Sequence, residues 1–448
     1  MTSDLLRPGQ VVFASYSKIP CIITGFLGSG GQGEVYRAEL RDDIVAVKWY
    51  RPAVAGPRQY RALEDLVRRN PPSSAFLWPL DIVTAPRSTS FGYVMPIRDH
   101  RFAGMGDLVR RNVDPTARVL ATIGFGLAEA FLSLHTQGLC YRDISFGNVF
   151  FDPETGEVLV CDNDNVTIDG TTPGGILGTP RFMAPEVVRG VALPSSRTDL
   201  FSLAVLLFNM FFIHHPFEGA GEQRYRVLDV AAMRELYGEH PVFIFDPDND
   251  SNRPISGTHQ NALDLWSYFP RELRELFVRS FTRGVTDPIN GRVRESEWRQ
   301  AMVRLRDSVL LCDSCGGDAE SFWEPSERWK GVSCWRCKAS LPVPVYLAFE
   351  TARSSEVSLF AVASPGAKVY PHHVEAGALY DFSRDIGEVV RHPSNRALLG
   401  LHNTSISTWR ATGAMGTVRE VEPGMTVGLS PRTIIDFGTS TAEVRSAT

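Results

Sequence analysis

The chain contains the stretch Tyr141-Arg142-Asp143-Ile144-Ser145-Phe146-Gly147-Asn148-Val149-Phe150, followed after a short interval by Val158-Leu159-Val160-Cys161-Asp162. Short β-type runs occupy residues 148–166, and the segment Asp152-Pro153-Glu154-Thr155-Gly156 between them is typical of a turn. The pattern predicts a polar loop, a strand, a turn and a second strand that ends at an acid.

A glycine-rich segment lies upstream between two strand-like runs. The apolar run Cys21 to Phe26 precedes Gly28-Ser29-Gly30-Gly31-Gln32-Gly33, and the strand-like residues Glu34 to Ala38 follow. Glycine has no Cβ, so such a backbone can fold over phosphates and point its N–H groups at them. A strand after the glycines favours a loop that covers a nucleotide over a dinucleotide-binding turn, which precedes a helix. A glycine-rich hairpin without a ligand is the alternative.

A lysine lies within the third strand-like run, Ile44 to Trp49. Strand alternation puts Lys48 on the opposite side from its apolar neighbours, and the helical pattern that follows over residues 60–67 carries Glu64. An ammonium group that bridges a helix carboxylate to phosphate oxygens is a known arrangement. We therefore expect Glu64 to pair with Lys48, although Asp65 is adjacent and a lone lysine is most often a solvated charge.

Most of the remaining sequence up to residue 310 has helical spacing. Helices are predicted over Val119 to Leu134 and over much of Thr198 to Arg306. The longest apolar run, Phe201 to Ile213, is interrupted by two polar residues and is shorter than the about 18 residues of a membrane span, so we interpret it as a buried helix. Met1 to Gln10 lack the apolar core of a signal peptide. We expect a cytoplasmic protein that does not bind a membrane.

In this order and spacing the motifs resemble the protein kinase family, whose catalytic loop has His-Arg-Asp, then Asn five residues after the Asp, and a metal-binding Asp beyond. Five further features agree with that family: the segment Gly178 to Glu186, Asp199 before the apolar helix Leu200 to Ile213, His215-Pro216-Phe217, Arg292 and Trp298. The resemblance covers about Ile22 to Arg306. It implies an α+β, two-lobed protein-kinase fold, with a β-rich N-lobe and an α-rich C-lobe over residues 21–310, after an N-terminal extension of residues 1–20.

The resemblance also implies roles for single residues. Phosphoryl transfer requires mainly positioned groups and neutralised charge. By resemblance, Asp143 is the carboxylate beside the attacking hydroxyl, Asn148 and Asp162 hold Mg²⁺, and Lys48 contacts the phosphates of ATP. Met95 resembles the gatekeeper before the hinge, where Pro96 has no N–H and leaves the Arg98 N–H as the expected donor. The expected ATP-binding residues are Gly28, Ser29, Gly30, Gly31, Gly33, Val35, Ala46, Lys48, Glu64, Met95 and Arg98.

Other positions depart from the family pattern. Tyr141 replaces the usual His, Ser145 stands where Ser/Thr kinases have a Lys, and Asp162-Asn163-Asp164 replaces Asp-Phe-Gly. Without that Lys, the transferring phosphate loses one neutralising cation. Without the Phe of Asp-Phe-Gly, the sequence lacks the residue whose packing switches the loop between active and inactive states in the family. We interpret Asp164 as a solvated or turn-capping carboxylate, with assistance to the metal as the alternative. These departures motivate a competing hypothesis, a pseudokinase scaffold that binds nucleotide and partners without efficient transfer.

The activation segment is expected to contain Thr171, Thr172, Thr179 and Glu186. Thr179 matches a position typical of kinases that act on Ser/Thr. Arg142 is kept, which suggests that a phosphate on Thr167, Thr171 or Thr172 pairs with it.

The sequences Asp143 to Asn148, Cys161 to Asn165 and Val242 to Pro247 together resemble one bacterial branch of eukaryotic-like Ser/Thr protein kinases. The branch is that of tellurite-resistance-type stress clusters, whose kinases accompany a von Willebrand A-domain protein and a PP2C-type phosphatase. The resemblance implies these two proteins as partners.

Four of the seven cysteines form two Cys-x-x-Cys pairs, Cys312/Cys315 and Cys334/Cys337, with 18 residues between the pairs. This spacing predicts a closed, four-thiolate structural Zn²⁺ site in a zinc ribbon over residues 311–340, and thiol redox chemistry is the alternative. The remaining cysteines, Cys21, Cys140 and Cys161, lie in apolar runs and are expected to be buried.

Short β-type runs separated by Gly, Pro, Asn and Ser fill residues 341–448, as in a small all-β sandwich. The runs Leu399 to Asn403, Pro423 to Val427 and Ile435 to Gly438 weakly resemble a forkhead-associated (FHA) domain. The phosphothreonine-binding signatures of that family are absent, so a docking or dimerisation domain is the broader interpretation.

The 448 residues suffice for several units with sizeable cores, and 43% hydrophobic residues exclude a disordered or fibrous chain. A net charge of −5 argues against nucleic acid as a partner. We therefore predict an ATP- and Mg²⁺-dependent protein serine/threonine kinase with a protein substrate, in which the zinc ribbon and the β-sandwich recruit partners.

Overall fold

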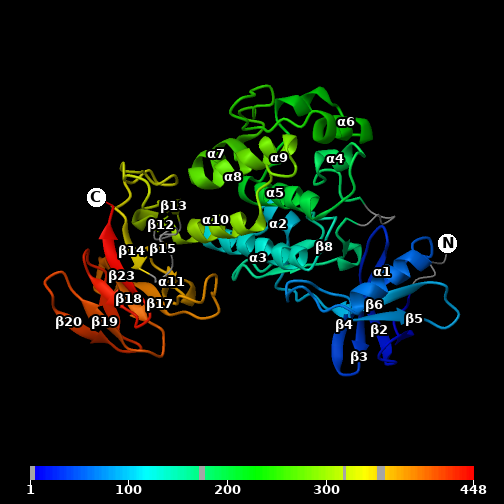
Figure 1. Ribbon diagram of the computed structural model, residues 1–448, viewed down its shortest axis with the longest axis horizontal. Helices are drawn as coiled ribbons and strands as arrows, with labels where there is room; N and C mark the ends of the chain where they lie inside the picture. Colours follow the sequence, from blue (N-terminus) through cyan, green and yellow to red (C-terminus); the bar gives the residue numbers. More distant parts are fainter. Residues whose placement is uncertain (1–5, 171–176, 316–318, 351–358, 448) are drawn as a thin grey trace. The chain divides into compact units, whose positions relative to one another are not determined.

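The computed structural model describes residues 6–170, 177–315, 319–350 and 359–447, and the chain forms two compact units. The first unit comprises Met1–Pro115, Val119–Ser267 and Arg271–Met302. The second comprises Thr116–Arg118, Tyr268–Pro270 and Val303–Thr448. Figure 1 labels helices and strands of both units.

The first unit begins with a closed barrel, in which the strands neighbour one another in the order β1-β2-β3-β4-β6-β5. These strands are β1 (Val11–Ala14), β2 (Pro20–Ser29), β3 (Gly33–Leu40), β4 (Asp43–Tyr50), β5 (Asp81–Thr84) and β6 (Phe91–Pro96). Alternate residues point inward, so Val45, Val47 and Trp49 of β4 join one core with Val12, Ile23 and Val94. Full burial of an apolar side chain of this size contributes roughly 1.5–3 kcal/mol. Helix α1 (Pro57–Val67) lies between β4 and β5 in the chain and buries Leu63 and Leu66.

A mainly helical part follows the barrel. Its helices are α2 (Met105–Val109), α3 (Ala117–Thr136), α4 (Pro185–Val188), α5 (Ser196–Phe212), α6 (Val230–Arg234), α7 (Gln260–Tyr268), α8 (Arg271–Phe281), α9 (Arg283–Thr286) and α10 (Glu295–Asp307). Helix α5 starts at the N-cap Ser195, whose side chain accepts a hydrogen bond from the Thr198 N–H, and it is buried along almost its whole length. The predicted apolar helix is therefore a core helix, with the Phe208 ring against Phe243 and Phe277.

Helix α3 has the length and apolar composition of a membrane span. Half of its residues are buried inside the fold, as in the core helix of a soluble protein, so α3 is weak evidence for a span.

Short strands position the polar loops between α3 and α5. The sheet β10-β9-β7 contains β7 (Ala103–Gly104), β9 (Val149–Phe151) and β10 (Val158–Val160), and the sheet β11-β8 contains β8 (Leu139–Cys140) and β11 (Thr167–Ile168). The predicted turn joins β9 to β10, because the Asp152 carboxylate accepts hydrogen bonds from the N–H groups of Glu154 and Thr155. The polar loop expected before β9 thus connects β8 to β9.

The second unit contains two antiparallel sheets with the orders β15-β14-β23-β22-β19-β20 and β16-β17-β18-β21. Their strands are β14 (Val345–Glu350), β15 (Leu359–Val362), β16 (Lys368–Val369), β17 (Gly387–His392), β18 (Asn395–Asn403), β19 (Trp409–Thr412), β20 (Val418–Val421), β21 (Thr426–Gly428), β22 (Ile434–Asp436) and β23 (Thr441–Ser446), with one short helix, α11 (Pro371–Val374). Residues of both sheets, among them Leu347, Leu401, Trp409 and Val427, share one core. The C-terminal region is therefore an all-β sandwich, as predicted.

The cysteine-rich segment packs within this second unit. Its hairpin is β12 (Val309–Leu311) with β13 (Glu320–Phe322). Cys312 and Cys334 join a core cluster with Trp323 and Leu341, and Phe360 of strand β15 completes it. The segment thus shares a core with the β-sandwich, while the predicted boundaries at residues 310 and 340 remain predictions.

Candidate functional site

The loop between β8 and β9 carries Asp143 and Asn148, and Thr179 reaches Asp143 from the segment before α4. The Asn148 side-chain amide donates to the Asp143 backbone carbonyl over 2.8 Å and to its carboxylate Oδ2 over 3.3 Å. The Thr179 hydroxyl donates to Asp143 Oδ1 over 2.8 Å. Asn148 is buried and Asp143 is only half-buried. Two side-chain donors thus hold the Asp143 carboxylate in one orientation, and the residue stays partly exposed.

Asp199, in the first turn of α5, fixes the start of this loop. Its carboxylate accepts the Tyr141 N–H over 2.5 Å and the Arg142 N–H over 2.9 Å. Arg142 adopts a φ of 78°, a conformation that a non-glycine residue keeps only where its surroundings enforce it. The buried Asp199 carboxylate therefore supplies the hydrogen bonds that enforce the bend next to Asp143.

Tyr141 stands where the family has His. Its ring is fully buried, and its hydroxyl donates to the backbone carbonyl of Cys161, the residue before Asp162. Burial raises the pKa of Tyr141 well above its ordinary value, so the hydroxyl keeps its proton and remains a donor. Through this hydrogen bond, Tyr141 connects the loop between β8 and β9 to the segment that carries Asp162.

Lys48 on β4 is buried among acids. Its ammonium lies 2.9 Å from Asp164 Oδ1, 3.4 Å from Asp162 Oδ1 and 3.0 Å from the amide oxygen of Gln32. Burial alone would lower the pKa of Lys48, but the charges of Asp164 and Asp162 outweigh it and raise the pKa. Lys48 therefore stays charged next to Asp162, as its expected role requires.

The structure does not bring Glu64 to Lys48. The Glu64 carboxylate accepts a hydrogen bond from the Tyr16 hydroxyl over 2.7 Å and one from Arg68 over 2.9 Å. The reason is helical geometry: Leu63 occupies the buried face of α1, and the next residue is rotated away by about 100°. Gln59, one turn earlier on the face of Leu63, instead donates its amide to the Tyr50 hydroxyl over 3.1 Å. The predicted Lys48–Glu64 pair is thus wrong for this structure.

Our interpretation of Asp164 is also wrong. Its side chain is fully buried rather than solvated, and it accepts hydrogen bonds from Lys48, from the Tyr50 hydroxyl over 2.6 Å and from the Tyr93 hydroxyl over 3.2 Å. Three donors around one carboxylate offset the cost of its burial. Asp164 belongs to the short 3₁₀ turn Asn163–Asn165, two residues after Asp162.

The glycine-rich loop connects β2 to β3. A Cβ added at Gly28, Gly30 or Gly31 would meet no atom within 4 Å, so the space beside the loop is open. A Cβ at Gly33 would lie 2.2 Å from the Trp49 carbonyl oxygen, which only glycine permits. Arg51 donates to the Ser29 hydroxyl over 3.0 Å and so braces the loop.

The expected adenine side lies on β3, β4 and β6. Ala46 pairs with Met95 across the β4–β6 ladder and Val35 pairs with Lys48 across the β3–β4 ladder. Ala46 and Met95 belong to one apolar cluster, and Val35 packs against it. Both Ala46 and Met95 are buried. Downstream of β6, the Arg98 guanidinium stacks on the Phe150 ring at 4.0 Å.

In the activation segment, Glu186 forms a buried bidentate ion pair with Arg292, with distances of 2.7 and 2.8 Å. Thr171 and Thr172 lie outside the described residues. Thr167 lies in β11, where its hydroxyl contacts the Cys140 thiol at 3.5 Å. Thr179 contacts Asp143, so this threonine reaches the expected catalytic carboxylate directly.

The chemistry of Asp162 and Asn148 fits Mg²⁺. Carboxylate and amide oxygens are the ligands that this hard cation prefers. The Asp162 side chain is 40% exposed, and Asn148 uses its Nδ2 for Asp143, which leaves its Oδ1 for a cation. Asp162 has a left-handed φ of 50°, the kind of enforced conformation found at functional sites.

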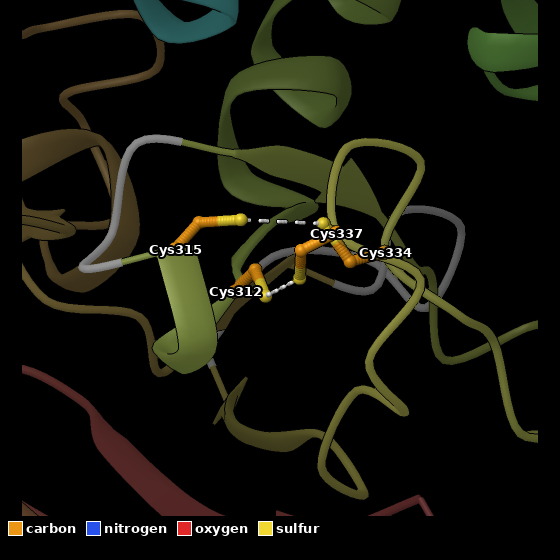
Figure 2. A group of neighbouring side chains, drawn as sticks. All are labelled: Cys312, Cys315, Cys334 and Cys337. Atoms are coloured by element: carbon orange, nitrogen blue, oxygen red, sulfur yellow. Dashed lines mark hydrogen bonds between the residues drawn. The ribbon is translucent and has the colours of Figure 1, made fainter.

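The four predicted zinc ligands converge (Figure 2). The sulfurs of Cys312 and Cys337 are 3.6 Å apart and those of Cys315 and Cys334 are 3.8 Å apart. A tetrahedral Zn²⁺ with Zn–S bonds of about 2.3 Å separates its sulfurs by about 3.8 Å, whereas a disulfide needs about 2.05 Å. The donor set and its spacing therefore fit a four-thiolate zinc site.

We expect the free energy of unfolding to fall as the pH rises from about 6.5 to about 9. His135 lies between Asp199, at 3.2 Å, and Glu295. Burial opposes its charge, but the two carboxylates prevail and raise the pKa of His135 to about 9 from 6.5. A raised pKa means that the stabilisation is complete below pH 6.5 and is lost as the pH passes through about 9. The difference between these two pKa values corresponds to about 3 kcal/mol in the free energy of unfolding.

The variant His135→Gln isolates this contribution, because it keeps a donor but carries no charge. We expect it to be about 3 kcal/mol less stable than the wild type at pH 6 and nearly equal at pH 10, as measured by urea unfolding of the full chain. A difference that is independent of pH would contradict the assignment.

A strand barrel is followed by a helical part. Together with a glycine-rich loop, a buried lysine and the residues Asp143, Asn148 and Asp162, this order is typical of the two-lobed protein-kinase fold. The model of the protein kinase domain family matches residues 22–277, more than half of the chain. The chain therefore belongs to the protein kinase family, which confirms the family predicted from the sequence.

Several named relatives are serine/threonine kinases. The chain is 30% identical over 328 residues to RqkA of Deinococcus radiodurans, a DNA damage-responsive serine/threonine-protein kinase, covering 68% of this chain and 46% of that protein. It is 28% identical over 208 residues to a probable serine/threonine-protein kinase of Corynebacterium efficiens, covering 43% and 31%. It is 34% identical over 134 residues to PknK of Mycobacterium tuberculosis, covering 29% and 12%. The chain thus spans less than half of each of these relatives.

Sequence reasoning missed the polar groups that surround Lys48. These are Gln32, Tyr50, Gln59, Tyr93 and Asp164. A signal was present for one of them, because Tyr50 follows Lys48 by two residues on one strand and must share its face.

Proposed function

We propose that the protein is an ATP- and Mg²⁺-dependent protein kinase that transfers the γ-phosphate to Ser or Thr of a protein partner. The half-buried Asp143 carboxylate, oriented by Asn148 and Thr179, carries this proposal. RqkA and PknK, to which the chain is similar, are named serine/threonine-protein kinases, and this supports Ser or Thr as the acceptor.

In the proposed reaction, Asp143 accepts the proton of the substrate hydroxyl as that oxygen attacks the γ-phosphorus. Lys48 binds phosphate oxygens of ATP, and the open glycine loop covers them with its N–H groups. Asn148 and Asp162 would hold Mg²⁺, which neutralises phosphate charge when bound. Ser145 supplies no cation where related kinases have Lys, so we expect a modest turnover.

The remaining modules would recruit partners. We propose that the cysteine cluster holds a structural Zn²⁺ and that the β-sandwich is a docking domain, with FHA-like phosphopeptide capture as its narrower form. A von Willebrand A-domain protein and a PP2C-type phosphatase are the proposed partners, on the resemblance of residues 143–148, 161–165 and 242–247 to tellurite-type stress kinases. The proposed compartment is the cytoplasm.

Incubation of the full chain with labelled ATP and a generic protein acceptor tests the proposal. We expect label on Ser or Thr when Mg²⁺ is present and none when it is chelated, because the single charge of Lys48 does not offset the charge of the phosphates without the metal. Thermal stabilisation by nucleotide without any transfer to several acceptors would contradict the proposed enzyme. It would favour the pseudokinase scaffold, which Tyr141, Ser145 and the Asp162-Asn163-Asp164 segment motivate.

A further inference from the structure

Lys48 has a carboxylate partner in this protein, but that partner does not come from helix α1. Two of the four polar contacts of its ammonium are to the oxygens of Asp164, at 2.9 and 3.1 Å. The Asp162 contact is longer, at 3.4 Å. The closest and most completely buried carboxylate is therefore Asp164.

Helix α1 offers no carboxylate on the face that approaches Lys48. Glu64 bonds to Tyr16 and Arg68, and Asp65 is exposed. Gln59 of α1 hydrogen-bonds to a residue beside Lys48, because its neutral amide donates to the Tyr50 hydroxyl. A helix that contributes only an amide cannot neutralise a buried ammonium.

Asp164 is itself held by the barrel. Tyr50 lies two residues beyond Lys48 on β4, and Tyr93 pairs with Lys48 across the β4–β6 ladder, so both hydroxyls reach the same carboxylate. Burial raises the pKa of both tyrosines well above the ordinary value, so both remain donors. The Asp164 carboxylate therefore has a fixed position relative to β4.

The adjoining Asn163 fixes the turn from its other side. Its amide donates to the backbone carbonyls of Leu77, over 2.8 Å, and Val160, over 3.0 Å, and the side chain is fully buried. Asp162 and Asp164 flank this pinned residue. The Lys48 partner thus lies two residues after the expected Mg²⁺ ligand Asp162, and it is an acid of this turn rather than an acid of α1.

We propose that Asp164 is the positioning residue that holds Lys48 for the phosphates of ATP, in place of a helix glutamate. The proposal rests on the proposed function, because it assigns how the lysine of that site is oriented. It makes the Asp162-Asn163-Asp164 segment a combined metal-binding and lysine-holding unit.

The test compares nucleotide affinity and kinetics in full-length variants. In Asp164→Asn we expect the Kd of Mg²⁺-ATP, measured by calorimetry, to rise by about tenfold and kcat/KM to fall on the order of 10²-fold, because a displaced ammonium misplaces the phosphates. Asp65→Asn is the matched control, an exposed carboxylate of α1, and we expect no change in either quantity. We expect Glu64→Gln to change the Kd of Mg²⁺-ATP and kcat/KM less than Asp164→Asn does.

A rescue variant separates positioning from a general structural effect. Gln59→Glu places a carboxylate on α1 beside the Tyr50 hydroxyl, so it should recover nucleotide affinity in the Asp164→Asn background. In the wild type it should weaken the affinity, because the new acid and the buried Asp164 would repel each other. A merely structural role of Asp164 would leave the affinity of the double variant as low as that of Asp164→Asn.

If Asp164→Asn does not fold, two further variants, Tyr50→Phe and Tyr93→Phe, test the proposal. Each removes one hydrogen-bond donor to Asp164 and keeps every charge. We expect each to raise the Kd of nucleotide several-fold. Unchanged affinity in both, or an unchanged Kd in a folded Asp164→Asn, would overturn the proposal. Wild-type protein that binds nucleotide but transfers no phosphate would contradict the proposed function alone, since the binding comparison does not require transfer.

Discussion

Asp143→Asn is expected to reduce phosphoryl transfer by about 10²- to 10⁴-fold, the usual contribution of a positioned general base. The effect should fall on kcat, because Asp143 is the proposed base for the hydroxyl acceptor, while Lys48 and Asp162 are the residues proposed to bind the nucleotide and its metal. We expect the KM for ATP to change by less than about threefold. Initial-rate kinetics with labelled ATP and a saturating acceptor measure both constants.

The substitution is close to isosteric, so the fold should survive it. The Thr179 hydroxyl can donate to the amide oxygen of the new side chain as it does to Asp143 Oδ1. Asp42→Asn, an exposed acid beside the β3–β4 turn, serves as the matched control and should keep wild-type rates. Equal kcat in the Asp143 variant and in the control would contradict the assigned base.

Removal of the metal from the cysteine cluster is expected to have the second large effect. Elemental analysis should find about one Zn per chain, because four thiolates at tetrahedral spacing close the coordination shell. Structural zinc in comparable small modules has an apparent binding free energy of about 10 kcal/mol or more at neutral pH. Because Cys312 and Cys334 lie in the core that contains Trp323 and Phe360, loss of the metal should loosen that core.

Cys334→Ser tests this expectation, with Ser314→Ala as the control, since Ser314 is exposed between two ligands and leaves all four thiolates. We expect the Cys334 variant to lose zinc and to become sensitive to protease between residues 310 and 345, whereas the control resembles the wild type. Wild-type protein without zinc would contradict the zinc site. A Cys334 variant as resistant to protease as the wild type would contradict it as well.

Patterns that are local in the sequence predicted much of this molecule. The order of the glycine loop, Lys48 and Asp143 sufficed for the two-part architecture, because strand and helix periods and turn residues are short-range signals. The two Cys-x-x-Cys pairs sufficed for the four-sulfur cluster for the same reason. The core helix α5 followed from its continuous apolar run.

The partner of Lys48 could not be predicted in this way. Which carboxylate reaches a buried ammonium depends on the rotation of α1 and on the register that sets Tyr93 opposite Lys48, and both are tertiary properties. Asp164 lies between two asparagines, so its local sequence looks polar and exposed, and only the donors from β4 and β6 explain its burial. A buried acid of this kind is detected from its partners rather than from its neighbours in the chain.

Mass-spectrometric mapping of phosphorylated residues tests the central claim most directly. The full-length wild type and Asp143→Asn are incubated with ATP and Mg²⁺, alone and with a protein acceptor. The account predicts phosphoserine or phosphothreonine in the wild-type reactions, on the chain or on the acceptor, and almost none with the variant. Equal phosphorylation in both, or none in a wild type that binds nucleotide, would contradict it.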